Sequence, residues 1–334
     1  MKSLSEVELH AWLRRVLART PGQIVGVGDD CAVLEAPPGE LAVTTDMLVE
    51  GVDFRRGWYG PELLARRACR VNLSDLAAMG ARPWACLLAL AWPREMDGAF
   101  GRRFLDAFRR EAEAWGMPVV GGDLSAAERV TICVTALGSF PVGRPVQRSG
   151  ARAGDLLVVF GDVGWSRWGL ELLEERECRG APALEQDVDF GCRNERDKAL
   201  RAHILPAVLV GPGAWLRERG LVRAMIDVSD GLGLDVARLA QASGLRAVLR
   251  LEAFPAPAGL APRDWWNKVV NGGEDFALVA ALSPGQLARV RRAYPGAWPA
   301  PRVIGRLVPG RSGVVLTYRG RQVRIPVKGF DHFA

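Results

Sequence analysis

Acidic residues that stand beside glycine, serine or threonine recur along this sequence, and several of them follow an apolar run. Residues 224–239, AMIDVSDGLGLDVARL, place Asp227 and Asp230 between such a run and a helical pattern. Residues 72–75, NLSD, repeat the form of residues 227–230, DVSD. A Ser-Asp pair before a helix is typical of an N-cap, which explains one acid in each motif and leaves Asp227 unexplained.

The full set of such acids predicts a metal site. Its other members are Asp29 and Asp30 in GVGDD, Asp46 in TTD, Asp123 in VVGGD, and Glu274 and Asp275 in GGED. We expect most of them at strand ends, where loops meet at one rim of a sheet. Crowded carboxylates repel one another and lose hydration, so the cluster needs cations. Oxygen ligands without paired Cys or His indicate Mg²⁺, with Mn²⁺ as a substitute.

Magnesium held by several aspartates usually carries phosphates, because substrate oxygens complete its shell. The sequence has no G-x-x-x-x-G-K-[ST] loop, and both GVGDDC and GLGLDV lack the third glycine of the dinucleotide fingerprint. Phosphates must therefore be held mainly by metal and by loop amides. On this interpretation a metal–phosphate complex neutralises Asp227 and Asp230, which have no evident partner nearby.

The elements that position these acids alternate between strand and helix patterns. In the first half, helical spacing occurs at 1–20, 61–80 and 99–116, and strand-like runs at 23–36, 39–54, 83–93, 117–123 and 129–140. In the second half, strands are predicted at 153–164, 224–230, 245–251, 272–282 and 302–308 and a helix at 231–244, with a peripheral helix or loop within 174–203. We predict an α/β (α+β) fold with two packed domains, residues 1–148 and 149–334.

Composition excludes several classes of protein. The 334 residues are 49% hydrophobic and 25% charged, which is typical of a soluble protein with a core, and no apolar stretch is long enough to cross a bilayer. The six cysteines are scattered, which predicts reduced thiols and a cytoplasmic location rather than a zinc site or a disulfide framework. The net charge of +6 is spread along the chain, which favours an anionic small ligand over nucleic acid.

Eight ordered motifs carry a resemblance across nearly the whole chain. GVGDDCAVL, TTDMLVEGVDF, VNLSDLAAMGARP, VVGGD, RSGARAGD, DVSDGL, GGEDF and KGFDHF closely resemble the thiamine-monophosphate kinase family of the AIR synthase-like superfamily. The resemblance implies a two-domain protomer whose N-terminal domain binds ATP and metal and pairs into a β-barrel in a homodimer. The C-terminal domain would complete the active site. The implied reaction transfers the γ-phosphoryl group of ATP to thiamine monophosphate, in line and without a phosphoenzyme.

The matching motifs imply a set of site residues. Those implied for several Mg²⁺ ions are Asp30, Thr44, Thr45, Asp46, Asp75, Asp123, Asp227 and Asp230. Those implied for ATP are Gly122, Asp123, Arg148 and Ser229, and those for the thiamine substrate are Asp53, Glu274 and Phe330. An arginine fork suits phosphate, and a carboxylate and an aromatic ring suit a cationic thiazolium. No catalytic acid or base is assigned, because the attacking phosphate oxygen is already anionic.

The sequence departs from the family pattern in four places. Where the family typically reads E-G-x-H-F, this chain has Asp53, either a solvated loop acid or a charge that needs a metal or an Arg/Lys nearby to admit an anion. The run HILPAVLVGPG lacks P-x-P-R, Arg167 and Trp168 replace small residues, and Leu105 stands where a tyrosine often contacts the nucleotide. Two alternatives therefore stay open: a related ATP-dependent enzyme with another acceptor, and a catalytically weakened paralogue that binds the ligands.

Overall fold

The computed structural model describes residues 6–17, 22–27, 29–94, 96, 98–185 and 194–329. The chain forms two compact units. Unit 1 comprises Met1–Leu76, Arg82–Pro141 and Glu177–Val188, and unit 2 comprises Ala77–Ala81, Val142–Arg176 and Asp189–Ala334. The division of function between residues 1–148 and 149–334 stays a prediction. Over the described ranges, none of the helices has the length and apolarity that a bilayer span requires.

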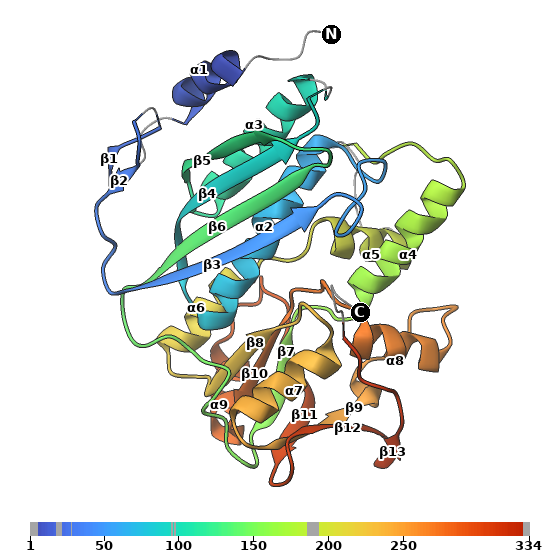
Figure 1. Cartoon of the computed structure of the whole chain (residues 1–334). Coiled ribbons are helices and arrows are strands. Elements are labelled where there is room, and N and C mark those ends of the chain that lie inside the picture. The colour runs from blue at the N-terminus through green and yellow to red at the C-terminus, as the bar shows by residue number, and fades with distance from the viewer. Residues whose placement is uncertain are drawn as a thin grey trace. The chain divides into compact units, whose positions relative to one another are not determined.

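Unit 1 is built on a four-stranded sheet in the order β3-β6-β4-β5. Its strands are β3 (Glu40–Val49), β4 (Arg82–Trp92), β5 (Val119–Ala126) and β6 (Thr131–Phe140). β6 is antiparallel to both neighbours, whereas β4 and β5 are parallel because α3 connects them. The helices α2 (Pro61–Met79) and α3 (Gly98–Ala114) cover one face of the sheet (Figure 1). The remaining elements are α1 (Glu6–Val16) and the antiparallel pair β1 (Gln23–Val25) and β2 (Val33–Leu34).

Alternation along the strands separates the two faces of this sheet. On β4, Cys86, Leu88 and Leu90 are buried. On β3, Val43 and Met47 point to the other face, where 62% and 57% of their surfaces are exposed. Leu41 and Leu87 are also exposed. Unit 1 therefore presents an apolar sheet face to solvent.

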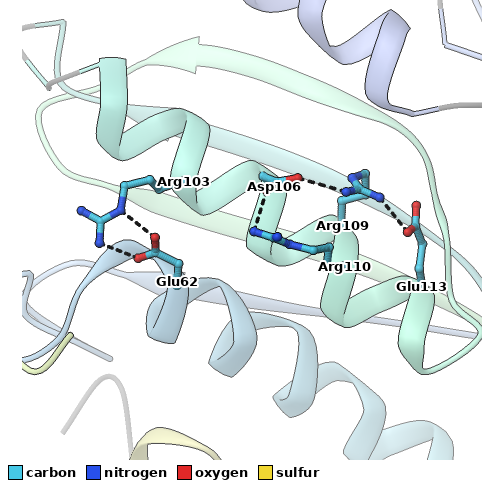
Figure 2. Close-up of polar contacts among 6 residues, drawn as sticks. All are labelled: Glu62, Arg103, Asp106, Arg109, Arg110 and Glu113. Atoms are coloured by element: carbon cyan, nitrogen blue, oxygen red, sulfur yellow. Dashed lines mark hydrogen bonds and ion pairs between the residues drawn. The ribbon is translucent and has the colours of Figure 1, made fainter. Parts of the chain in front are cut away.

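Ion pairs fasten α3 to α2 and line the exposed side of α3 (Figure 2). Arg103 donates two hydrogen bonds to Glu62, from Nε to Oε1 at 2.6 Å and from Nη2 to Oε2 at 2.9 Å. Asp106 pairs with Arg109 and Arg110 at helical spacings of three and four residues. The pairs within α3 each contribute a few tenths of a kcal/mol, about as in isolated helices. The bidentate pair between the helices also fixes their register.

Unit 2 contains a seven-stranded sheet in the order β13-β12-β9-β11-β7-β10-β8, antiparallel except for the β9–β12 pair. The strands are β7 (Leu156–Phe160), β8 (Ala224–Asp227), β9 (Arg246–Arg250), β10 (Leu278–Leu282), β11 (Arg302–Val308), β12 (Gly313–Tyr318) and β13 (Arg321–Val323). The helices are α4 (Trp165–Cys178), α5 (Glu195–Ile204), α6 (Val210–Glu218), α7 (Leu232–Ala242), α8 (Pro262–Asn271) and α9 (Pro284–Ala293), with a 3₁₀ turn, η1, at Leu251–Ala253. The central strands β10 and β7 are apolar because the sheet is buried between helices.

Two sequence-based expectations about unit 2 need correction. The strand predicted over residues 272–282 is shorter, because Glu274 and Phe276 adopt positive φ angles of 63° and 49° that interrupt an extended chain. Trp168, expected to add bulk at a site of small residues, is buried in the core beside Trp165, with ring centroids 5.7 Å apart. Arg167 is exposed and pairs with Glu171 one turn later.

Candidate active site

In unit 1, side chains of α2 reach the middle of β3. The Thr44 hydroxyl donates to the carboxylate of Asp75, and the Asp46 backbone N–H donates to Asn72 Oδ1 at 3.1 Å. Asn72 is buried and its amide nitrogen donates to the carbonyl of Ala68, so its orientation is fixed. Asn72 and Asp75 are three residues apart and lie on one face of the helix. The structure thus brings together Thr44, Asp46 and Asp75.

The expectation that most of the acids lie at strand ends is wrong in unit 1. Thr44 and Asp46 lie in the middle of β3, which continues to Val49 because Met47 still pairs with Cys133 of β6. Asp123 lies within β5, and Asp75 lies inside α2. An N-cap role for the NLSD motif is excluded for the same reason, because all four residues are helical.

Other predicted metal ligands of unit 1 are placed apart from this group. A row of paired residues, Asp46, Val134, Leu88 and Gly122, runs across the whole sheet. Three strand spacings separate its ends by about 14 Å, whereas ligands of one Mg²⁺ ion lie within about 4 Å of each other. Asp123, next to Gly122, therefore cannot share an ion with Asp46 and Asp75 of the same chain.

Thr45 and Asp30 also point elsewhere. Thr45 lies on the opposite face of β3 from Thr44, and its hydroxyl donates to the carbonyl of Val134 at 3.1 Å. Asp30 is exposed, and its backbone N–H donates to Asp29 Oδ1 at 3.0 Å. The predicted ligand set of unit 1 is thus one close group with outlying members.

Gly122 is required by the packing of the sheet. Its φ is 158°, and a Cβ atom at this position would lie 1.8 Å from the carbonyl oxygen of Leu88. Only a residue without a side chain permits this approach. Leu105, a position considered for nucleotide contact, is buried in unit 1 and packs in its core.

In unit 2, the DVSD and GGED motifs lie side by side. The backbone N–H of Glu274 donates to the carbonyl of Ser229 at 2.7 Å, and that of Phe276 donates to the carbonyl of Val228 at 2.8 Å. Val228 in turn donates to the carbonyl of Ala277. The structure therefore brings the predicted nucleotide residue Ser229 next to the predicted substrate residue Glu274.

Asp235 and Arg238 of α7 organise the DVSD motif, although neither belongs to the residues predicted for the site. One oxygen of Asp235, Oδ2, accepts the backbone N–H groups of Ser229, Asp230 and Gly231 at 3.0–3.2 Å. Arg238 Nη1 lies 2.5 Å from Asp230 Oδ2 and 2.8 Å from Asp235 Oδ1. Burial raises the pKa of Asp235 to about 6, partly offset by these donors.

The expectation that Asp230 has no partner nearby is therefore wrong, because α7 places Arg238 in contact with it. Asp235 and Arg238 are three residues apart near the start of a helix, a spacing that predicts an ion pair between them. Asp227 is buried at the last position of β8, opposite Leu278 of β10. It is the member of the acidic set that does end a strand, as predicted.

Asp275 contacts the start of α4, and Glu274 lies near His203 of α5. Asp275 accepts the backbone N–H groups of Gly164 at 2.7 Å and Ser166 at 3.0 Å. Burial raises the pKa of Asp275 to about 8, although these two donors favour its charged form. Glu274 Oε2 lies 3.6 Å from Nδ1 of the buried His203, which is 3.1 Å from the Ser166 hydroxyl. Asp275 thus holds the first turn of α4, while the side chain of Glu274 remains partly exposed.

Arg148 is exposed and is not brought to Ser229. Its carbonyl accepts a hydrogen bond from Ser243, the C-cap of α7, whereas Ser229 precedes the first turn of that helix. Eleven helical residues separate the two by about 16 Å. The two predicted ATP residues of unit 2 therefore lie at opposite ends of α7.

Asp53 has a definite structural contact. Its Oδ2 accepts the backbone N–H of Val49 at 2.7 Å, which closes the turn after β3. This half-buried acceptor is not a freely solvated loop acid. Phe330, the third predicted substrate residue, lies outside the described residues.

The side-chain oxygens of two sets of residues, one in unit 1 and one in unit 2, are chemically suitable ligands for a magnesium ion. Thr44, Asp46, Asp75, Asp227 and Asp230 offer only oxygen atoms, which hard divalent cations prefer. Across the part of the chain that is described, no group of three or more His, Cys, Asp or Glu side chains is placed to hold an ion. A magnesium ion here would need further oxygens from ligands or water, as is usual for magnesium with phosphates.

Comparison with known proteins identifies the family. The family described as AIR synthase related protein, N-terminal domain, matches residues 28–140, and its C-terminal domain counterpart matches residues 152–317. A thiamine-monophosphate kinase of Mycobacterium tuberculosis is 36% identical over 301 residues, which cover 88% of this chain and 82% of the relative. The chain belongs to the thiamine-monophosphate kinase family.

Solved structures of the same family share the fold. The thiamine-monophosphate kinase from Stenotrophomonas maltophilia superposes with a TM-score of 0.79 at 29% identity, covering 96% of this chain and 99% of that one. AaThiL complexed with AMPPCP and TMP superposes with a TM-score of 0.72 at 29% identity, covering 100% and 99%. The mixed α/β architecture of both units is therefore the architecture of thiamine-monophosphate kinases, as predicted.

Proposed function

We propose that this protein is a phosphotransferase that moves the γ-phosphoryl group of ATP to the phosphate of thiamine monophosphate and so forms thiamine diphosphate. The observation that carries the proposal is the similarity to AaThiL complexed with AMPPCP and TMP over the whole chain. AMPPCP is a non-hydrolysable analogue of ATP. The relatives named thiamine-monophosphate kinase at 31–37% identity support the same reaction.

The two acidic groups are assigned to the cofactor of this reaction. We assign Thr44, Asp46 and Asp75 of unit 1, and Asp227 and Asp230 of unit 2, to Mg²⁺ ions that accompany ATP. Bound magnesium would neutralise the charge of the phosphates. Asn72 holds the middle of β3 against α2, and Asp235 holds the turn of residues 228–231, so both groups are positioned before any ligand arrives.

The remaining site residues are assigned to the substrates. We assign Gly122, Asp123, Arg148 and Ser229 to ATP, and Glu274, Phe330 and Asp53 to the thiamine substrate. The partly exposed carboxylate of Glu274 suits a cationic thiazolium ring. No general base is required, because the acceptor phosphate oxygen is anionic and the residues need only bind and orient it.

Incubation with Mg-ATP and thiamine monophosphate, with product separation by chromatography, tests the proposal. We expect thiamine diphosphate and ADP in equal amounts. Absence of the diphosphate at high enzyme concentration would reject the proposal.

A different acceptor is the second candidate, and the replacement of the family histidine by Asp53 favours it. A panel of phosphorylated and unphosphorylated alcohols, assayed for ADP release, separates the two candidates. Another acceptor with a higher kcat/KM than thiamine monophosphate would establish the second candidate. If ATP and thiamine monophosphate bind without any turnover, the chain is instead a non-catalytic binding protein.

We further propose a cytoplasmic homodimer in which the sheets of unit 1 pair. The exposed apolar face, with Val43 at 62% and Met47 at 57% exposure, supports this arrangement because such surface usually contacts a partner. Val43→Lys places a charge on that face and is expected to convert the dimer to a monomer in sedimentation analysis. Sedimentation of the unchanged protein as a monomer at micromolar concentration would contradict the proposal.

A further inference from the structure

The turn of residues 228–231, between β8 and α7, has almost no backbone group left for a ligand. Asp235 Oδ2 accepts the N–H groups of Ser229, Asp230 and Gly231. Val228 is paired through both its N–H and its carbonyl, and the carbonyl of Ser229 accepts from Glu274. The carbonyl of Gly231 accepts the N–H of Asp235 itself.

This arrangement occupies amides that lead into a helix start. Free N–H groups and the helix dipole normally make an N-terminus attractive to phosphate. Here a carboxylate that is 1% exposed accepts the N–H groups of the N-cap residue Gly231 and of the two residues before it, Ser229 and Asp230. What the turn offers instead is the side chains of Ser229 and Asp230, of which Asp230 is an acid that Arg238 holds.

Arg238 completes the arrangement by holding two carboxylates at once. Its Nη1 contacts Asp235 Oδ1, which leaves Oδ2 directed at the three amides. The same nitrogen contacts Asp230 Oδ2, so the orientation of Asp230 depends on Asp235 through both a backbone bond and a shared arginine. A substitution at residue 235 is therefore expected to alter the orientation of Asp230 both through its backbone N–H and through Arg238.

We infer that Asp235 is a positioning residue that makes this turn a cation site: it occupies the amides of residues 229–231, which keeps phosphate from these three N–H groups, and it aims Asp230 at a divalent ion. The inference rests on the proposed function only in that the ligand is ATP with Mg²⁺. Its structural part, the occupation of the amides, stands independently of any acceptor.

Three variants and one control test the inference. Asp235→Ala removes the acceptor, Asp235→Asn keeps one acceptor oxygen without charge, and Arg238→Gln removes the ion pair while leaving the acceptor. Asp264→Asn changes an exposed acid in the first turn of α8 and serves as the matched control. Two quantities are measured: amide hydrogen exchange of residues 229–231, and the Kd of AMPPCP with Mg²⁺ and with EDTA.

The ratio of these two Kd values separates positioning from a general structural role. Loss of structure alone would weaken binding with and without Mg²⁺ by similar factors. We expect Asp235→Ala to reduce the preference for the Mg²⁺ form by about tenfold, since one lost charged contact is worth about 1.4 kcal/mol. Exchange of the three amides should accelerate by at least about tenfold. Asp235→Asn should give a smaller change in the same direction, and the control should match the unchanged protein.

An unchanged ratio together with unchanged amide exchange in Asp235→Ala would overturn the inference. If that variant does not fold, Asp235→Asn and Arg238→Gln decide, because a ratio within twofold of the unchanged protein in both would also overturn it. Failure of the proposed function looks different. The unchanged protein would then form no thiamine diphosphate, while the amide exchange would still report whether Asp235 occupies the turn.

Discussion

The motifs at residues 72–75 and 227–230 have nearly the same letters and opposite surroundings. NLSD lies inside α2, where all backbone amides are used by the helix and Asn72 and Asp75 project from one face toward β3. DVSD begins at the last residue of β8 and continues into a turn, where the amides of residues 229–231 need an outside acceptor and receive it from Asp235. The comparison shows that a carboxylate can be positioned either by helical spacing alone or by a second carboxylate that holds its backbone.

The largest effects are expected when the acid of either motif is removed. Asp75→Ala and Asp230→Ala should each lower kcat/KM by at least about a hundredfold, because an electrostatic contact to the transferring phosphates is worth about 3 kcal/mol. Steady-state kinetics with thiamine monophosphate measures this. Asp264→Asn is the control, with activity expected within twofold of the unchanged protein. A large loss in one variant and none in the other would show that only one motif serves the reaction.

Burial of Asp275 in unit 2 predicts an effect of pH on stability. The pKa of Asp275 is raised to about 8, so the folded chain keeps a proton that the unfolded chain releases above about pH 4. This contribution to the free energy of unfolding is complete below about pH 4 and is lost as the pH rises to about 8. Its size is on the order of a few kcal/mol. Urea unfolding across this range should show a decline that Asp275→Asn reduces. An equal decline in both proteins would contradict the assignment.

The helical motif can be tested through its anchor. Asn72→Ala removes the acceptor for the Asp46 N–H and is expected to lower the free energy of unfolding by about 1–3 kcal/mol, because a buried donor loses its partner. Activity should also fall, since one of the bonds between β3 and α2 is lost while that of Thr44 to Asp75 remains. Urea denaturation and kinetics on the same preparation measure both quantities. If activity falls without any loss of stability, Asn72 contacts a ligand rather than anchoring the strand.

The smallest effect concerns the turn that ends β3. Asp53→His restores the residue typical of the family, and we expect the KM for thiamine monophosphate to fall by a few fold because a negative charge is removed. The free energy of unfolding should fall by about 1 kcal/mol, since the Val49 N–H loses its carboxylate. Asp53→Asn is the matched control for charge alone. An unchanged or higher KM in Asp53→His would contradict a role in substrate binding.

Periodicity predicted part of the elements, but neither the position of the acids within them nor the helices α4, α6, α8 and α9 and the strands β12 and β13. The amphipathic patterns of α2, α3 and α7 and the apolar runs of β4 and β6 correspond to elements of the structure. The strand-like run over residues 39–54 already extended beyond the TTD motif, so the expectation of acids at strand ends did not fit Asp46, and pairing of β3 with β6 up to Val49 confirms this. The course of the loop that carries Arg148 depends on Ser243, which is far away in sequence. Asp235 and Arg238, in contrast, are local and were predictable from their spacing.

One consequence follows from the fact that Glu274 and Asp275 are neighbours in the chain. Asp275 holds the first turn of α4 through Gly164 and Ser166, while Glu274 remains partly exposed. A ligand that displaces Glu274 is therefore expected to shift the neighbouring Asp275 and, through it, the first turn of this fourteen-residue helix. Binding of the acceptor would then change the first turn of α4, and that helix is where a structural response to binding is expected.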